Sequence, residues 1–158
     1  MKSIIVLVYS LIIGSSAFAY HTGNVNGQRL IDQKNINERL LRYFKEHFPN
    51  AKEVVWEEQL DNYIVNFVEN DVRTHIVYDR EGTFISSIRY YKEQQLPSYL
   101  LDILKKHYAG KTVFAVTEQT SEAGVVYFIK MEDAKGWIIV KMDSEGNHGI
   151  VERYSKAS

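Results

Sequence analysis

Apolar residues recur with two different periods along the chain, and the first period is helical. Four large apolar residues stand three or four positions apart, which predicts an amphipathic helix over residues 37–48 with this stripe: Leu40, Leu41, Phe44 and Phe48. We expect Asn35 to cap this helix, because Glu38 stands three positions later as in a capping box. Pro49 predicts its end, since proline has no amide hydrogen with which to extend the helix.

The second period is two residues, which is typical of β-strands. Four runs rich in β-branched and aromatic residues follow the helix, at residues 52–58, 63–69, 73–79 and 83–91. The separators are short, turn-forming sequences, so consecutive strands should pair as antiparallel hairpins. The sequence therefore predicts a unit of one helix followed by a four-stranded meander.

The same order of elements then occurs a second time. Pro97 opens a second helix whose apolar stripe lies 60 positions after the first, and Gly110 is expected to cap its end. Four more strands are predicted at residues 112–118, 125–131, 137–142 and 148–154, where the spacing between the copies rises to 64. We attribute the rise to a longer hairpin loop in EQTSEAG, residues 118–124, because a hairpin tip tolerates insertions well.

A short motif marks the same place in both copies. Asp-x-Glu-Gly stands at residues 79–82 and 143–146, and Arg-Tyr-x-Lys follows at residues 89–92 and 153–156. A hairpin turn with a positive φ explains Gly82 and Gly146, and neither copy has the alternating oxygen ligands of a calcium loop. The prediction is an α+β fold, a tandem repeat over residues 35–95 and 96–158, with the helices on one face of antiparallel sheets that can join edge to edge.

The alternation of side chains also assigns the two faces of the strands. We expect the following residues to form the core under the helices: Val54, Trp56, Tyr63, Val65, Phe67, Ile76, Tyr78, Phe114, Val116, Tyr127, Ile129, Met131, Val140 and Met142. The opposite face, which we call the open face, should then contain Asn66, Val68, His75, Val77, Lys130, Trp137, Ile139 and Lys141.

The last strand of each unit has apolar residues on both faces. We favour the phase of Ser87, Arg89 and Tyr91 as the open one, together with the matching Val151, Arg153 and Ser155. Aromatic residues and arginine on an uncovered sheet face are typical of a protein-binding patch. The candidate partner-binding residues are His75, Arg89, Tyr91, Trp137, Lys141 and Arg153; the alternative is that they form ordinary cross-strand pairs.

The N-terminus predicts export. Lys2, an apolar run over residues 4–13 and Ala17-Phe18-Ala19 indicate a signal peptide over residues 1–19, and this run is too short to span a bilayer. Residues 20–34 are polar and aperiodic, so we expect a flexible leader. The chain has no cysteine and a formal net charge of −1, which argues against disulfides and against nucleic acid as a partner. We expect a periplasmic or secreted protein with no transmembrane segment after cleavage.

Catalytic chemistry is not indicated. The five histidines are scattered without metal-ligand spacing, and no nucleophile elbow, phosphate-binding loop or dinucleotide-binding motif is present. We therefore predict a protein that is not an enzyme, without catalytic residues, metal site or cofactor.

Several stretches taken together resemble the PepSY-like proteins of Bacteroidetes, a group related in shape to the β-lactamase inhibitory protein. They are FPNAKEVVWEE, the Tyr-x-Val-x-Phe strand, the VYDREG hairpin and LPSYLLDILKKHY, and the resemblance covers residues 35–158. It implies an exported tandem α+β protein whose sheet face grips, and could inhibit, a peptidase or another envelope enzyme. The inhibitor has disulfides and this chain has no cysteine. The resemblance is therefore better evidence for the fold than for the function.

The leading hypothesis is thus an exported, non-enzymatic protein that binds another exported protein. Two alternatives stay open. One is a carrier of small ligands or peptides with a tyrosine-lined pocket between helices and sheet, and the other is a structural component of an envelope assembly.

Overall fold

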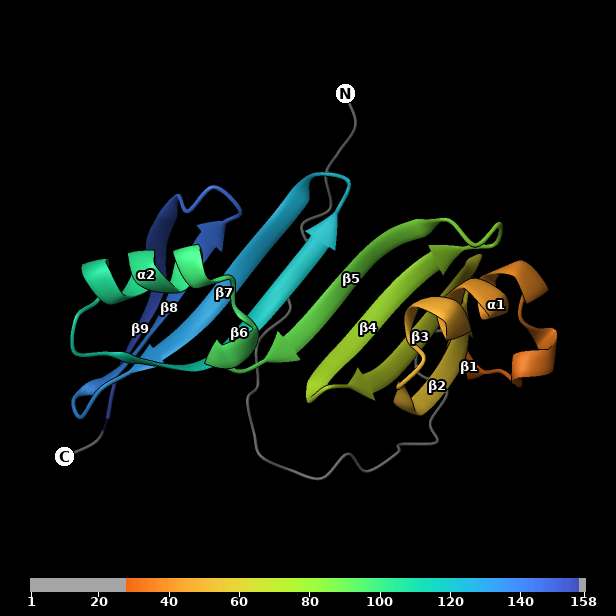
Figure 1. Cartoon of the computed structure of the whole chain (residues 1–158), viewed down its shortest axis with the longest axis horizontal. Helices are drawn as coiled ribbons and strands as arrows, with labels where there is room; N and C mark the ends of the chain where they lie inside the picture. Colours follow the sequence, from red (N-terminus) through yellow and green to blue (C-terminus); the bar gives the residue numbers. More distant parts are fainter. Residues whose placement is uncertain (1–27, 157–158) are drawn as a thin grey trace.

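The structure, a computed structural model, describes residues 28–156 and has an α+β fold (Figure 1). The helices are α1 (Glu38–His47) and α2 (Ser98–His107), preceded by the short 3-10 helices η1 (Gln33–Asn35) and η2 (Glu93–Gln95). Nine antiparallel strands form one open sheet in sequence order: β1 (Gln28–Leu30), β2 (Lys52–Gln59), β3 (Asn62–Glu69), β4 (Val72–Asp79), β5 (Phe84–Tyr91), β6 (Thr112–Ser121), β7 (Gly124–Glu132), β8 (Gly136–Asp143) and β9 (His148–Ser155). The predicted signal peptide and residues 20–27 of the leader lie outside the described residues.

The end of the predicted leader is ordered into regular structure, which corrects the expectation for residues 28–34. β1 pairs antiparallel with β2, with Arg29 opposite Glu58. η1 follows, capped by Asp32, whose side chain accepts from the amide of Lys34. The composition of this stretch gave no sign of a strand, because the strand is only three residues long and exists by pairing with the edge of β2.

The N-cap of the first helix lies two residues later than predicted. Asn37 is the N-cap residue, and its Oδ1 accepts from the amides of Arg39 at 2.9 Å and Leu40 at 3.4 Å. Asn35, the predicted cap, instead ends η1. The end before Pro49 is confirmed, since His47 is the last helical residue. α2 also ends earlier than expected, at His107.

Both helices lie on one face of a continuous sheet, as predicted (Figure 1). Directly paired residues of antiparallel strands share a face, so the register follows one face across the join between β5 and β6. One such row carries core residues of both halves at its ends: Phe67, Thr74, Arg89, Glu118, Tyr127 and Met142.

Three of the four extra residues of the second half lengthen β6 and β7, the fourth lies in the β7–β8 turn, and the β6–β7 hairpin loop stays short. The turn between β6 and β7 has only Glu122 and Ala123, as short as the turn of Leu60 and Asp61 between β2 and β3. Each of the longer strands gains paired residues, and the added end of β6 pairs with β5 from Gln119 to Ser121. The expected longer loop is therefore wrong, because backbone groups that can pair with β5 are better satisfied in a strand than in a loop.

Each helix covers its own core. The core of the first half is rich in aromatic residues: Ile36, Leu40, Phe44, Trp56, Tyr63, Val65, Phe67, Ile76 and Tyr78. The core of the second half is mainly aliphatic: Val72, Tyr91, Leu96, Leu100, Leu104, Val116, Tyr127, Ile129, Met131, Ile138, Val140 and Met142. Of the predicted core residues only two are not buried, namely Val54, which packs at the margin, and Phe114.

The repeated Asp-x-Glu-Gly turns lie under the helices. Gly82 and Gly146 have φ values of 85° and 88°, a conformation that favours glycine. A Cβ atom at Gly82 would lie 3.2 Å from Leu40 Cβ, and one at Gly146 would lie 2.5 Å from Ile103 Cδ1. Both glycines therefore allow a turn to approach a helix closely, and the motif occurs twice because each helix packs against such a turn.

Candidate binding surface

The open face contains the eight residues that the sequence assigned to it. The register places Asn66 beside His75 and Lys130 beside Ile139, and their chain neighbours point into the helix-side cores. Most of these side chains are half-buried; Lys141 is exposed and Ile139 is buried. Neither helix covers this face, so it is the natural place to look for a binding surface.

The sequence analysis placed Ser87, Arg89 and Tyr91 of β5 on the open face, and this is wrong. Tyr91 pairs with Val116, is only 5% exposed and belongs to the core under α2. Arg89 lies on the same side, where its Nη1 is 3.0 Å from Glu118 Oε1. The sequence offered apolar residues on both faces of this strand, and the polar residues Ser87 and Arg89 were mistaken for a sign of exposure, although they line the join between the two cores.

A buried carboxylate holds this join together. Glu118 is 9% exposed and accepts from Arg89 and, at 2.5 Å, from the hydroxyl of Tyr91. Burial, followed by this bond to the carboxylate, raises the pKa of Tyr91, so the phenol stays protonated and donates. Glu118 was not singled out from the sequence, because a Glu in a strand is normally a solvated residue.

Arg153 also lies on the helix side, which is the second correction to the predicted set. It pairs with Ile138, a core residue under α2, and it stands exposed on the edge strand β9. The six candidates therefore divide between two faces. His75, Trp137 and Lys141 share the open face, whereas Arg89, Tyr91 and Arg153 do not.

In the first half, polar residues of the open face are bonded to one another. His75 Nδ1 lies 2.9 Å from Asn66 Oδ1, and Asn66 Nδ2 donates to Glu57 Oε1 at 3.3 Å. Burial lowers the pKa of His75, which favours the neutral imidazole. These two hydrogen bonds link side chains of β2, β3 and β4, so the polar groups are bonded to one another.

From the end of β5 into the second half, the open face carries an alternating row of ammonium groups and aromatic rings. We call this row the lysine–aromatic ladder: Lys92, Phe114, Lys130 and Trp137. Lys92 Nζ lies 4.7 Å from the centre of the Phe114 ring, and Lys130 Nζ lies 4.9 Å from the same centre. Lys130 Nζ also lies 3.1 Å from the centre of the Trp137 ring. Such contacts between a cation and the face of a ring are favourable. Lys130 is half-buried, and this burial lowers its pKa.

The ladder includes a residue that the sequence analysis placed in the core. Phe114 is 37% exposed and its ring meets that of Trp137 edge-on, with ring centres 6.5 Å apart. The pairing of β6 with β7 shifts register between Val113 and Ala115, so Phe114 sits in a β-bulge. A bulge interrupts the alternation of side chains, and alternation was the basis of the prediction.

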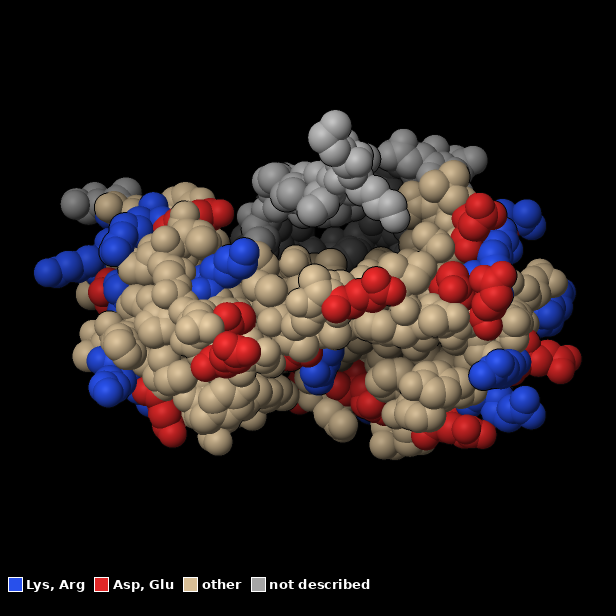
Figure 2. Space-filling view, turned by 90° about the horizontal axis from the view of Figure 1, so that it is seen from above, with Lys and Arg blue, Asp and Glu red and all other residues tan. Residues whose placement is uncertain are grey.

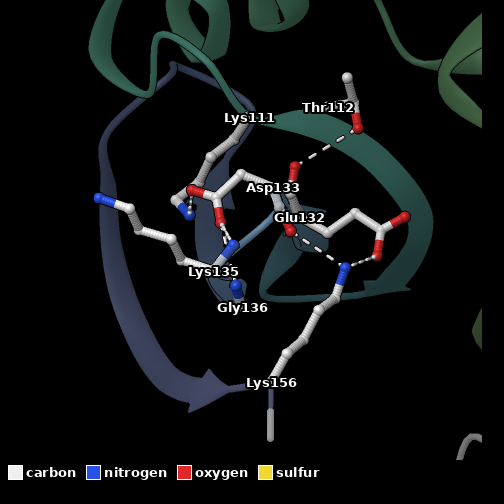
Figure 3. A network of polar contacts seen from close by, with 7 residues as sticks. All are labelled: Lys111, Thr112, Glu132, Asp133, Lys135, Gly136 and Lys156. Atoms are coloured by element: carbon white, nitrogen blue, oxygen red, sulfur yellow. Dashed lines mark hydrogen bonds and ion pairs between the residues drawn. The ribbon is translucent and has the colours of Figure 1, made fainter. Parts of the chain in front are cut away.

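Near the end of the described chain, a separate cluster ties together the start of β6, the β7–β8 turn and the residue after β9 (Figure 3). Asp133 accepts from Lys111 Nζ at 2.5 Å and from the amides of Lys135 and Gly136. These bonds, that of Lys111 first, lower the pKa of Asp133 to about 2. Lys156 Nζ contacts Glu132 Oε2 at 3.2 Å, so the ammonium groups of Lys111 and Lys156 both have carboxylate partners.

The rest of the described surface offers little chemistry. Charges of both signs are interspersed over the side shown in Figure 2. Within residues 28–156, no three His, Cys, Asp or Glu side chains come together as metal ligands, and no helix there is long and apolar enough to cross a membrane. Two shallow hollows of about 330 and 300 Å³ lie on the outer side of α1 and around the β8–β9 turn, away from the helix–sheet interfaces.

Comparison with solved structures places the fold. A BLIP-like protein from Bacteroides fragilis is 16% identical with a TM-score of 0.52, covering 76% of this chain and 86% of the other. The chain has a BLIP-like fold. A DUF2874 family protein from Bacteroides ovatus gives 16% identity, a TM-score of 0.52 and coverage of 76% and 87%. A second, from Bacteroides uniformis, gives 15% identity, a TM-score of 0.51 and coverage of 75% and 88%.

These matches confirm the likeness to β-lactamase-inhibitor-like proteins of Bacteroidetes at the level of fold. No family model matches the chain, and no curated protein matches it in sequence. The BLIP-like fold agrees with the position of both helices on one face of the sheet. A shared fold does not identify a partner.

Proposed function

We propose that the chain is an exported, non-enzymatic binding protein of the PepSY-like type, whose open face contacts another exported protein. The observation that carries the proposal is the lysine–aromatic ladder, which stands on a face that neither helix covers. Half-exposed aromatic rings beside cations are the residues that most often dominate binding energy at protein interfaces. Export is supported by the signal-peptide pattern of residues 1–19 and by a similar fold in a provisionally periplasmic protein from Bacteroides eggerthii.

The two halves are interpreted as copies of one unit. Each contains a ten-residue helix followed by four strands, and each packs an Asp-x-Glu-Gly turn against its helix. Duplication gives a sheet about twice as long as either unit provides. A stable complex needs about 800 Å² on each partner, and a long uncovered sheet offers that area without a cleft.

A retention experiment tests the proposal. The chain from Tyr20 to Ser158 is immobilised, and exported proteins of the source organism are passed over it, with peptidases and other envelope enzymes tested first. The variant Trp137→Ala/Tyr154→Ala removes two aromatic side chains, since Tyr154 is 53% exposed and pairs with Trp137 on the open face. We expect retention to fall by at least about tenfold.

The matched control is Tyr43→Ala/Tyr99→Ala, which removes two exposed aromatic side chains from the helices. Retention by the control should equal that of the unchanged chain. Equal loss in both variants, or no loss in either, contradicts binding through the open face. A protein that is retained in fixed stoichiometry by every variant supports a structural role in an assembly instead.

A further inference from the structure

Three ammonium groups on the open face, one at the end of the first half and two in the second half, form no ion pair within the described chain. Among residues 28–156 no ion pair includes Lys92, Lys130 or Lys141, although six ion pairs are formed elsewhere. Lys92 donates to the carbonyl of Phe114, and the ammonium of Lys130 lies over the rings of Phe114 and Trp137. By contrast, Lys111, just before β6, is paired with Asp133, and Lys156, just after β9, is paired with Glu132.

The nearest carboxylates of this face are already engaged within the chain. Glu132 accepts from Lys156, and Glu152 accepts from the hydroxyl of Tyr154. Asp143 accepts from the amides of Glu145 and Asn147 in its own turn. A binding partner with carboxylates would therefore meet ammonium groups that form no ion pair within the described chain.

The register sets the spacing of two of these lysines. Lys130 pairs with Ile139, and Lys141 stands two residues further along β8, opposite Phe128. Diagonal neighbours of this kind lie about 7–8 Å apart. In an extended peptide, side chains two residues apart lie on one face at a spacing of about 6.6–6.8 Å, so a Glu-x-Glu segment matches the backbone spacing of the two lysines.

We propose that the open face of the second half binds an extended acidic segment of its partner protein, with carboxylates at alternate positions over Lys130 and Lys141. The inference rests on the proposed binding function and names the chemistry of the partner. Phe128 and Ile139 form an apolar floor between the two lysines, and Trp137 flanks them. Such a floor favours a peptide with apolar side chains beside its carboxylates over an acidic polysaccharide, which has none.

Three synthetic peptides of equal length test the spacing and the sign of the charges. The first alternates Glu with apolar residues, the second has the same composition with adjacent Glu residues, and the third replaces every Glu of the first by Lys. Binding to the isotope-labelled chain from Tyr20 to Ser158 is followed by amide chemical shifts in NMR titrations. We expect the alternating acidic peptide to bind about tenfold more tightly than the other two, with shifts centred on strands β7 and β8.

The lysines are tested by the variant Lys130→Gln/Lys141→Gln. Its affinity for the alternating peptide should fall by roughly tenfold, because two charge pairs are lost and a surface charge pair contributes only modestly in water. The matched control Lys45→Gln/Lys106→Gln removes two exposed lysines from the helices and should leave the affinity unchanged. The affinity of the unchanged chain should also fall as salt is raised.

Four outcomes overturn the inference, and the last of them leaves the proposed function standing. One is equal affinity for the alternating and adjacent acidic peptides, and another is equal loss in both lysine variants. The third is tighter binding of hyaluronate, an acidic polysaccharide, than of any peptide. If none of the peptides binds while an exported protein is still retained through Trp137, the acidic segment is wrong and the proposed function stands.

Discussion

The two halves of the sheet agree under their helices and differ on the open face. At positions 64 apart, the helix-side residues are buried in both halves: Tyr63 and Tyr127, Val65 and Ile129, Phe67 and Met131, Ile76 and Val140, Tyr78 and Met142. On the open face the corresponding residues change character: Asn66 becomes Lys130, Arg73 becomes Trp137 and His75 becomes Ile139. One face of the sheet thus has the same packing pattern in both halves, while the other differs in chemistry between them.

This difference agrees with the proposal that binding uses the open face. A core position must stay apolar because leaving a cavity or burying a polar group costs several kcal/mol. A half-exposed position on a sheet has no such requirement, so its residue type can follow a binding task. The first half uses its open-face polar atoms in the chain from His75 to Glu57, whereas the second half leaves its lysines without carboxylates.

The largest expected effect sharpens the comparison of the two cores. Phe44 has ring centres of Trp56 and Phe67 within 5.2 Å, so Phe44→Ala removes aromatic contacts as well as buried area. We expect a loss of about 4 kcal/mol in the free energy of unfolding, against about 3 kcal/mol for Leu104→Ala under α2. Urea unfolding measures both, and a smaller loss for Phe44→Ala would contradict an energetic advantage of the aromatic core.

The second prediction concerns the join, which belongs to neither half alone. Glu118→Ala removes the acceptor of Arg89 and of the buried Tyr91 hydroxyl, so we expect a loss of about 2 kcal/mol in the free energy of unfolding. The control is Glu122→Ala in the exposed β6–β7 turn, which should change stability by less than about 0.5 kcal/mol. Equal small losses would mean that backbone pairing alone joins the halves.

The fold was largely predictable from the sequence because strong periodicity survives in long elements. Both helices and eight of the nine strands were expected within a few residues of their observed bounds. β1 was missed, since a strand of three residues is too short to show a period and depends on a neighbouring strand. The cap at Asn37 was missed because two asparagines stand close together and the pattern could not choose between them.

The candidate surface was only partly predictable, for reasons that are local. His75, Trp137 and Lys141 were assigned correctly, because their strands alternate without interruption. Phe114 was misplaced by a bulge, and β5 was misread because buried Ser87 and its neighbour Arg89 look like surface residues. No sequence signal shows that Lys130 lies between two rings, since this depends on the register of three strands.

The smallest expected effect uses a residue in which the two cores differ. Burial, and next the nearby Tyr43, raises the pKa of Tyr78 to about 12, while the position 64 residues later is Met142, which does not titrate. A raised pKa means that the folded state favours the neutral phenol. The stabilising contribution is therefore complete below pH 10 and is lost as the pH rises toward 12.

We expect the unchanged chain to lose about 1 kcal/mol more than Tyr78→Phe between pH 9 and pH 11, because the variant has no phenol to ionise at this position. Chemical unfolding at a series of pH values measures the difference. Tyr99→Phe, a change at an exposed tyrosine of α2, should keep the alkaline loss of the unchanged chain. An identical alkaline loss with and without Tyr78 would show that the alkaline response comes from the tyrosines of the second half, such as Tyr91 and Tyr127, whose pKa values burial also raises.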